Sequence, residues 1–205
     1  MRLLVATTNP NKIREIQGML EGLDIDLIGL RDVPPVDEPE EMGVTFAANA
    51  RDKARYYARA TGLLAVAEDS GLIIDALGGE PGVHSARYGG RDAPDYPAKF
   101  ALIYDRLAAC GGLRSPARFV CALAVASGDL VLFESYGVIE GRIADAPGGN
   151  QGFGYDPIFF YPPLGRTLAE IDTSDKAAIS HRGQAFRRLR TFLESSCPDH
   201  EDGQV

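Results

Sequence analysis

Four consecutive residues with chemically useful properties, Glu68-Asp69-Ser70-Gly71, follow the apolar run Leu64-Ala65-Val66-Ala67. The apolar run is typical of a buried strand, and α/β proteins place reactive groups where such strands end beside a sharp turn. Two adjacent carboxylates at this point predict a divalent-cation site or a general base, with Gly71 permitting the turn. The alternative interpretation is that Glu68 and Asp69 only begin a solvated turn.

Two further segments combine cations with groups that can bind phosphate or a polar ring. The first is Thr7-Thr8-Asn9-Pro10-Asn11-Lys12. It precedes a predicted helix, whose N-terminal N–H groups and dipole would favour an anion. The second contains Lys176, His181 and Arg182, close to the last predicted helix. Each segment also has an ordinary structural interpretation, as an Asn-Pro turn before a helix or as exposed charges.

Taken together, these side chains predict a site for a metal-bound polyphosphate attached to a base. The carboxylates suit Mg²⁺, which combines few carboxylates with the phosphate oxygens of a substrate, and they are Glu40, Glu68 and Asp69. The cations that suit a polyphosphate are Lys12, Lys53, Lys176 and Arg182. The aromatic residues that suit stacking on a base are Phe153 and Tyr155, which follow or interrupt a run of glycines.

The elements that must position these residues alternate in the manner of an α/β domain. Apolar periodicity predicts helices near residues 12–21, 45–61, 95–109 and 180–193. It predicts strands near residues 2–7, 25–30, 64–67, 72–77, 117–127 and 130–139. Gly128-Asp129 predicts a hairpin between the last two strands, so the sheet should be mixed. We expect one domain over residues 1–194 and a disordered tail at 195–205.

Composition and missing motifs argue against several functional classes. The formal net charge of -8 over 205 residues disfavours a nucleic-acid polymer or an anionic membrane as the main partner. The three cysteines include no CxxC pair, which disfavours a disulfide framework or a zinc-thiolate site and favours the cytoplasm. The sequence contains no P-loop, Rossmann fingerprint, HExxH or nucleophile-elbow motif.

Six separated motifs resemble, in order, the inosine/xanthosine triphosphate pyrophosphatases, which hydrolyse non-standard purine nucleoside triphosphates. The motifs are TTNPNK (7–12), EEMGVTF (40–46), EDSGL (68–72), LGGEPGVHSARY (77–88), GFGYDPIF (152–159) and KAAISHRG (176–183). The resemblance implies a long mixed β-sheet flanked by helices, with two lobes, a nucleotide cleft between them and a homodimeric assembly. It covers nearly the whole chain, so its specificity far exceeds that of any single motif.

The resemblance also implies roles for individual residues. Residues 7–12 would contact the triphosphate, Glu40 and Asp69 would bind the metal, and Ser70 would contact the substrate. Asp69 would also accept a proton. The positions that would bind the nucleoside are Phe153, Gly154, Tyr155, Asp156, Lys176, His181 and Arg182.

Two residues depart from the family pattern. Thr8 and Ala48 stand where many members have glycine and glutamate. Without a glutamate at position 48, metal binding would rest on Glu40, Glu68 and Asp69, with Glu41 as a further candidate.

The predicted reaction is Mg²⁺-dependent hydrolysis of ITP, dITP or XTP to a nucleoside monophosphate and pyrophosphate. Asp69 would orient or deprotonate a water that attacks the α-phosphorus, while Lys12 and Lys53 stabilise the leaving group. Inosine and xanthosine present an acceptor at O6 where adenine presents a donor, which fits the donors in 176–182. The alternatives are a pyrophosphatase for pyrimidine or modified nucleotides, and a nucleotide-binding sensor without turnover.

Overall fold

The computed structural model describes residues 1–90 and 95–196, and its centre is a seven-stranded sheet in the order β2-β1-β3-β4-β5-β6-β7. β1 (Arg2–Val5), β2 (Asp26–Gly29) and β3 (Leu64–Ile74) are parallel. β4 (Pro116–Ser127), β5 (Leu130–Ile143), β6 (Phe159–Tyr161) and β7 (Arg166–Thr167) continue the sheet with antiparallel pairing. The predicted mixed sheet and the hairpin between β4 and β5 are therefore confirmed.

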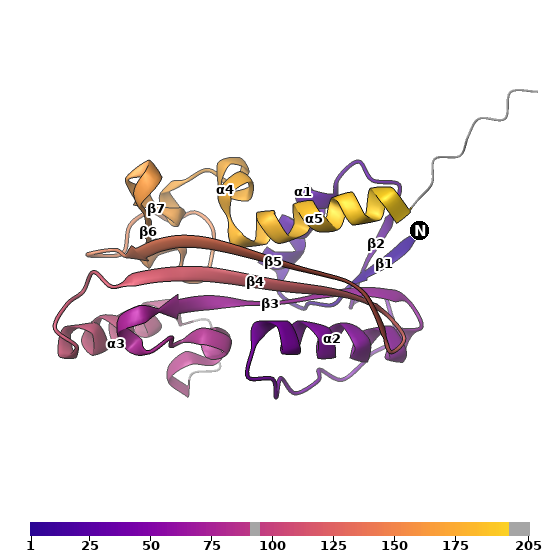
Figure 1. The fold of residues 1–205 in the computed structure, drawn as a ribbon, viewed down its shortest axis with the longest axis horizontal. Helices are drawn as coiled ribbons and strands as arrows, with labels where there is room; N and C mark the ends of the chain where they lie inside the picture. Colours follow the sequence, from indigo (N-terminus) through magenta and orange to yellow (C-terminus); the bar gives the residue numbers. More distant parts are fainter. Residues whose placement is uncertain (91–94, 197–205) are drawn as a thin grey trace, which may run out of the picture.

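Helices cover both faces of the sheet (Figure 1). α1 (Pro10–Leu20), α4 (Thr173–Ile179) and α5 (His181–Ser196) lie on one side, and α2 (Phe46–Thr61) and α3 (Tyr96–Ala109) lie on the other. Leu3, Ile16 and Phe186 share a core beneath α1 and α5, whereas Leu4 and Ala54 share a core beneath α2. Among the described residues, no helix is long and apolar enough to cross a membrane.

Local capping explains where the first two helices begin. The Asn9 side chain accepts hydrogen bonds from the backbone N of Asn11 (2.9 Å) and Lys12 (3.4 Å), so α1 begins at Pro10, earlier than predicted. Thr45 caps α2 in the same way, through a 3.1 Å bond from the Ala48 backbone N. Both caps lie at the ends of segments that line the cleft described below.

The expected turn at residues 68–71 is wrong, because β3 continues through these residues to Ile74. Asp69 and Gly71 pair with Ala122 and Val120 of β4, in the middle of the sheet. Gly71 is required for close packing instead. A Cβ atom there would lie 2.3 Å from Ser85 Oγ and 2.6 Å from the Gly82 carbonyl oxygen. The acidic pair therefore sits on a rigid central strand, and alternation sends its two side chains to opposite faces.

The C-terminal part of the chain contains short elements that periodicity did not predict. β6, β7 and α4 have three, two and seven residues, too few for a clear apolar period. The last helix extends to Ser196, past its predicted end. The tail expected to be disordered, residues 195–205, overlaps the end of this helix. The rest of that predicted tail, residues 197–205, lies outside the described residues.

Candidate active site

One cleft collects most of the predicted site residues from segments far apart in the sequence. Its walls come from the β1–α1 connection, α2, β3, the turn at 82–90, the 153–156 segment and the α4–α5 region. The predicted residues that line it are Thr7, Thr8, Asn9, Lys12, Lys53, Asp69, Ser70, Phe153, Gly154, Tyr155, Asp156, Lys176, His181 and Arg182. The grouping of phosphate-type and base-type residues therefore exists in space.

Four predicted residues lie outside this lining. Pro10 is the first residue of α1, and Asn11 accepts a 2.7 Å hydrogen bond from Arg14 Nη2. Glu40 is exposed and borders neighbouring hollows. Glu68 is buried on the other face of β3 from Asp69. The structure therefore gives no support to Glu40, Glu68 and Asp69 as one ligand cluster.

Asp69 is held by a short chain of hydrogen bonds. The Asn49 side chain on α2 donates from Nδ2 to Asp69 Oδ2 (2.9 Å) and accepts at Oδ1 from the Gly43 backbone N (2.7 Å). Burial raises the pKa of Asp69 to about 6, and the nearby charge of Glu41 adds to this, although the Asn49 hydrogen bond opposes it. Asp69 is thus an oriented carboxylate with a pKa close to neutral pH, as a general base requires.

Besides Glu38, the loop carboxylate that lines the cleft is Glu41 rather than Glu40, and the charge of Glu41 acts on Asp69. Its carboxylate pairs with Lys53 Nζ and lies 3.7 Å from Arg87 Nη1. No group of three or more His, Cys, Asp or Glu residues suited to a metal occurs among the described residues. Mg²⁺ needs only one or two protein carboxylates when phosphates supply other oxygens. Asp69 and Glu41, two carboxylates whose charges repel, fit that requirement.

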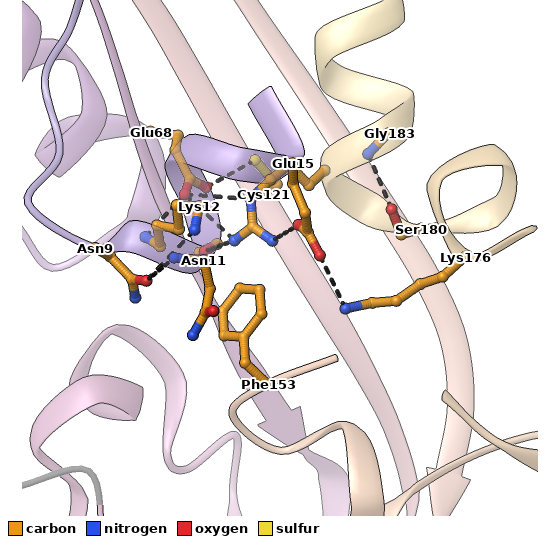
Figure 2. A network of polar contacts seen from close by, with 12 residues as sticks. Asn9, Asn11, Lys12, Glu15, Glu68, Cys121, Phe153, Lys176, Ser180 and Gly183 are labelled. Carbon is orange, nitrogen blue, oxygen red and sulfur yellow. Dashed lines mark hydrogen bonds and ion pairs between the residues drawn. The ribbon is translucent and has the colours of Figure 1, made fainter. Parts of the chain in front are cut away.

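Glu68 neutralises two cations that line the cleft, of which Lys12 is labelled in Figure 2. Its Oε1 lies 2.8 Å from Lys12 Nζ and 3.3 Å from Arg182 Nη2, and its Oε2 accepts from Cys121 Sγ at 3.2 Å. Burial alone would raise the pKa of Glu68, but the charges of Arg182 and Lys12 outweigh it and hold that pKa well below its ordinary range. Glu68 is therefore the counter-ion that positions Lys12 and Arg182.

The part of the cleft predicted to bind the base is built around Phe153. Lys176 Nζ and the guanidinium carbon of Arg182 lie 5.0 Å and 5.3 Å from the centre of its ring. Glu15 reaches from α1 to both cations, with Oε1 3.1 Å from Lys176 Nζ and Oε2 2.7 Å from Arg182 Nη1 (Figure 2). Asp156 holds Lys176 from the other side at 2.7 Å. These contacts fix two donors beside an aromatic face.

The 152–156 segment is closed by its own aspartate. Asp156 Oδ2 accepts a 2.8 Å hydrogen bond from the Phe153 backbone N. Gly152 has φ +69°, and a Cβ atom there would lie 2.2 Å from Asp156 Oδ2, so this position requires glycine. The buried Tyr155 ring packs against Tyr96 (5.3 Å between centres, 90°), and its hydroxyl donates to the Ser85 carbonyl oxygen at 2.8 Å. Tyr155 therefore supports the wall, and Phe153 is the ring better placed for stacking.

His181 lies in the cleft wall as a neutral imidazole. Its ring stacks on Phe119 (4.9 Å between centres, 10°). Burial, assisted by the charge of Arg182, lowers its pKa well below the ordinary value. Its Nδ1 is buried and has no hydrogen-bond partner. Buried polar atoms are normally paired, so this unpaired nitrogen is an exception among the described residues.

Comparison with known proteins identifies the family of this chain. The Ham1 family model matches residues 3–192. The chain belongs to the Ham1 family. A protein named dITP/XTP pyrophosphatase from an Exiguobacterium species is 45% identical over 193 residues, covering 94% of this chain and 97% of the relative. A protein of the same name from Thermus thermophilus is 45% identical over 201 residues, covering 98% and 96%.

A solved Ham1 protein from Coxiella burnetii matches this family member with a TM-score of 0.86 and 41% identity, covering 95% of this chain and 99% of the other. This confirms the fold expected from the motif resemblance. Sequence reasoning named Glu41 only as a further candidate ligand, and it gave Glu15 and Asn49 no place in the site. Helical spacing offered one signal. Asn49 and Lys53 lie four residues apart, and Lys12 and Glu15 lie three residues apart, so the members of each pair share a helix face.

Proposed function

We propose that this Ham1-family protein hydrolyses non-standard purine nucleoside triphosphates, ITP, dITP and XTP, to the monophosphate and pyrophosphate. The observation that carries the proposal is that one cleft combines two groups of side chains. One group is Asp69, Glu41 and Lys53, whose charges act on one another, and the other is Phe153 with its two flanking cations. The relatives from Exiguobacterium and Thermus thermophilus are named dITP/XTP pyrophosphatase, and that name supplies the substrate class.

Asp69 is the proposed general base. Asn49 holds one of its oxygens, which leaves the other free to orient or deprotonate the attacking water. The raised pKa of about 6 makes the carboxylate a stronger base than an ordinary aspartate while keeping it mostly ionised at pH 7. Lys12 and Lys53 are placed to stabilise charge on the leaving pyrophosphate.

Asp69 and Glu41 are the residues that would hold a divalent cation, which we propose to be Mg²⁺. When bound, the cation would neutralise charge that develops on the phosphates. Glu40 and Glu68 were also predicted as ligands, and Glu40 remains a secondary candidate because its loop adjoins Glu41. Glu68 fits the ion-pair role better, since its side chain is 2% exposed and lies between Lys12 and Arg182.

Recognition of the base is proposed to rest on fixed donors. Arg182 Nη1 donates to Glu15 and has a second hydrogen that could be donated to a carbonyl oxygen of the base such as O6. Lys176 is likewise anchored by Glu15 and Asp156. An adenine amino group would face these donors without an acceptor, which disfavours ATP. Replacing Arg182 by alanine should reduce the preference for ITP over ATP more than it reduces the maximal rate.

The test is pyrophosphate release from ITP, XTP, dUTP, TTP and ATP with and without Mg²⁺, for the wild type and Asp69→Asn. We expect release from ITP and XTP that needs the metal and is lost in the variant. Hydrolysis in ¹⁸O-labelled water should place the label in the monophosphate, and label in pyrophosphate would reject attack at the α-phosphorus. Binding without release would favour a sensor, and preference for dUTP or TTP would favour a pyrimidine enzyme.

We also propose an oligomeric state and a cellular location for the protein. Leu130, Leu132 and Tyr136 are apolar or aromatic residues of β5 with exposures of 64%, 43% and 47%. This apolar surface is consistent with a homodimer, which light scattering after size exclusion would test. Cys121 and Cys110 are both free thiols, which is consistent with a reducing cytoplasm and would be tested by fractionation of cells.

A further inference from the structure

Lys99 on α3 is a buried cation with no part in the chemistry proposed above. Its side chain is among the largest that are fully buried, with the residue 1% exposed. Within the described residues, its Nζ donates to the Ala86 carbonyl oxygen and lies 4.9 Å from the centre of the Tyr96 ring. Burying an ammonium group is costly unless its hydrogen bonds compensate. The contact with Ala86 therefore requires an explanation.

The Ala86 carbonyl lies where a short helical turn ends. The turn at Gly82–Gly90 is helical up to Ala86, after which Arg87 (φ -115°, ψ 20°) and Tyr88 (φ -58°, ψ 135°) depart from helical geometry. The last carbonyls of a helix lack partners within the helix, and a lysine can supply a donor. Lys99 thus caps this turn from a neighbouring helix.

The capped turn forms part of the cleft wall. Ser85, Ala86 and Arg87 all line the cleft. The carbonyl before the capped one, that of Ser85, accepts the Tyr155 hydroxyl at 2.8 Å. Two successive carbonyls are therefore held by donors from different elements. The next residue in the chain is Arg87, whose Nη1 lies 3.7 Å from Glu41 Oε2, in the part of the cleft proposed to bind the phosphates.

We propose that Lys99 is a positioning residue that acts through Arg87. By capping the Ala86 carbonyl it fixes the direction in which the chain leaves the turn, and so holds the Arg87 guanidinium beside Glu41, where it meets the triphosphate. The expected effect of Lys99 on KM rests on the proposed function. The effect of Lys99 on the geometry of the turn does not depend on that function.

The experiment is a double-mutant cycle with Lys99→Met and Arg87→Ala, using ITP and Mg²⁺. We expect Lys99→Met to raise KM about tenfold, the scale of one lost charge-assisted hydrogen bond, with kcat within about twofold. In the Arg87→Ala background, Lys99→Met should change KM little, because the effect has no residue left to act through. Asp105→Asn, on the exposed side of α3, is the matched control and should behave as wild type. Lys99→Arg, which retains a donor, should recover much of the affinity.

Additive effects in the cycle, an unchanged KM in Lys99→Met or an unchanged KM in Arg87→Ala would each overturn the proposal. If Lys99→Met fails to fold, Lys99→Gln, which is too short to reach Ala86, takes its place. If the wild type does not hydrolyse ITP, the proposed function fails separately. Deuterium uptake at residues 85–90 then decides whether Lys99 holds the turn, because it should rise in the variant, and unchanged uptake overturns the inference.

Discussion

Glu68 and Asp69 are neighbours on β3, and replacing each by its amide should have opposite effects on stability. Glu68→Gln removes the counter-ion of Lys12 and Arg182, whose nitrogens lie 2.8 Å and 3.3 Å from Oε1. Breaking a buried ion pair by removing one partner costs about 3–5 kcal/mol, because the remaining charge is left uncompensated. The Glu68 side chain is 2% exposed, so solvent screens this loss little. We expect a decrease in the free energy of unfolding of that order.

Asp69→Asn should instead stabilise the metal-free protein. Burial raises the pKa of Asp69 from 3.8 to about 6, and each unit corresponds to about 1.4 kcal/mol. The ionised carboxylate therefore costs about 3 kcal/mol at pH 7, and the amide removes that cost. Because the pKa in the folded protein is the higher one, the cost grows as pH rises from 3.8 through about 6. The gain from Asp69→Asn should disappear near pH 4.

The assay is urea unfolding of wild type, Glu68→Gln and Asp69→Asn in EDTA, at pH 7 and pH 4, followed by circular dichroism. A loss in Glu68→Gln together with a gain in Asp69→Asn at pH 7 is the expected pair of results. Equal losses in both variants would show that the two carboxylates share one environment. That result would refute the division of roles between the faces of β3.

Three further predictions concern the cleft itself. Asn49→Ala should lower kcat about 10- to 100-fold with little change in KM, because Asp69 loses the partner that orients it; steady-state kinetics with ITP would check this. Phe153→Ala should raise KM about tenfold or more, since stacking on a base contributes about 1–3 kcal/mol, and Phe153→Tyr should retain most of the affinity. His181→Asn should remove part of the loss of stability that occurs as pH falls below 6.5. Burial lowers the pKa of His181 in the folded state, so the unfolded chain binds the extra proton first. The exposed His84, changed to Asn, is the control in the same unfolding titration.

The sheet, the main helices and the family were predictable from the sequence because each rests on repeated or separated signals. Ile16 and Leu20 of α1 are four residues apart and both are buried, as apolar periodicity requires. The turn at 68–71 was mispredicted because polar residues in a central strand resemble a strand end. Glycine occurs at position 71 because a side chain there would collide with Ser85 and Gly82. The sequence around position 71 does not reveal that packing.

The contents of the cleft were predictable by residue type but not by pairing. Lys176, Arg182 and Phe153 were expected together, whereas the contacts of Glu15 with both cations join residues separated by 161 and 167 positions. Such pairings depend on how α1 packs beside α5, which is set by the whole core. For the same reason the sequence could not distinguish Glu40 from Glu41, since the choice depends on which carboxylate the loop turns toward Lys53.

Charge pairing inside the cleft gives a physical reason for the proposed metal. Each lysine or arginine that lines the cleft already has a carboxylate partner, and the pairs are Lys12–Glu68, Lys53–Glu41, Arg87–Glu41, Lys176–Asp156 and Arg182–Glu15. The walls therefore offer little net positive charge to a triphosphate, and the whole chain carries -8. A cation bound by Asp69 and Glu41 would neutralise Glu41 and leave Lys53 free to turn toward the phosphates. The side chains of Lys176 and Arg182 are 5% and 3% exposed, so their ion pairs stay closed and would present fixed donors to uncharged carbonyl oxygens of a base. The proposed metal would thus supply the charge for the phosphates, while the protein would supply hydrogen bonds of fixed direction for the base.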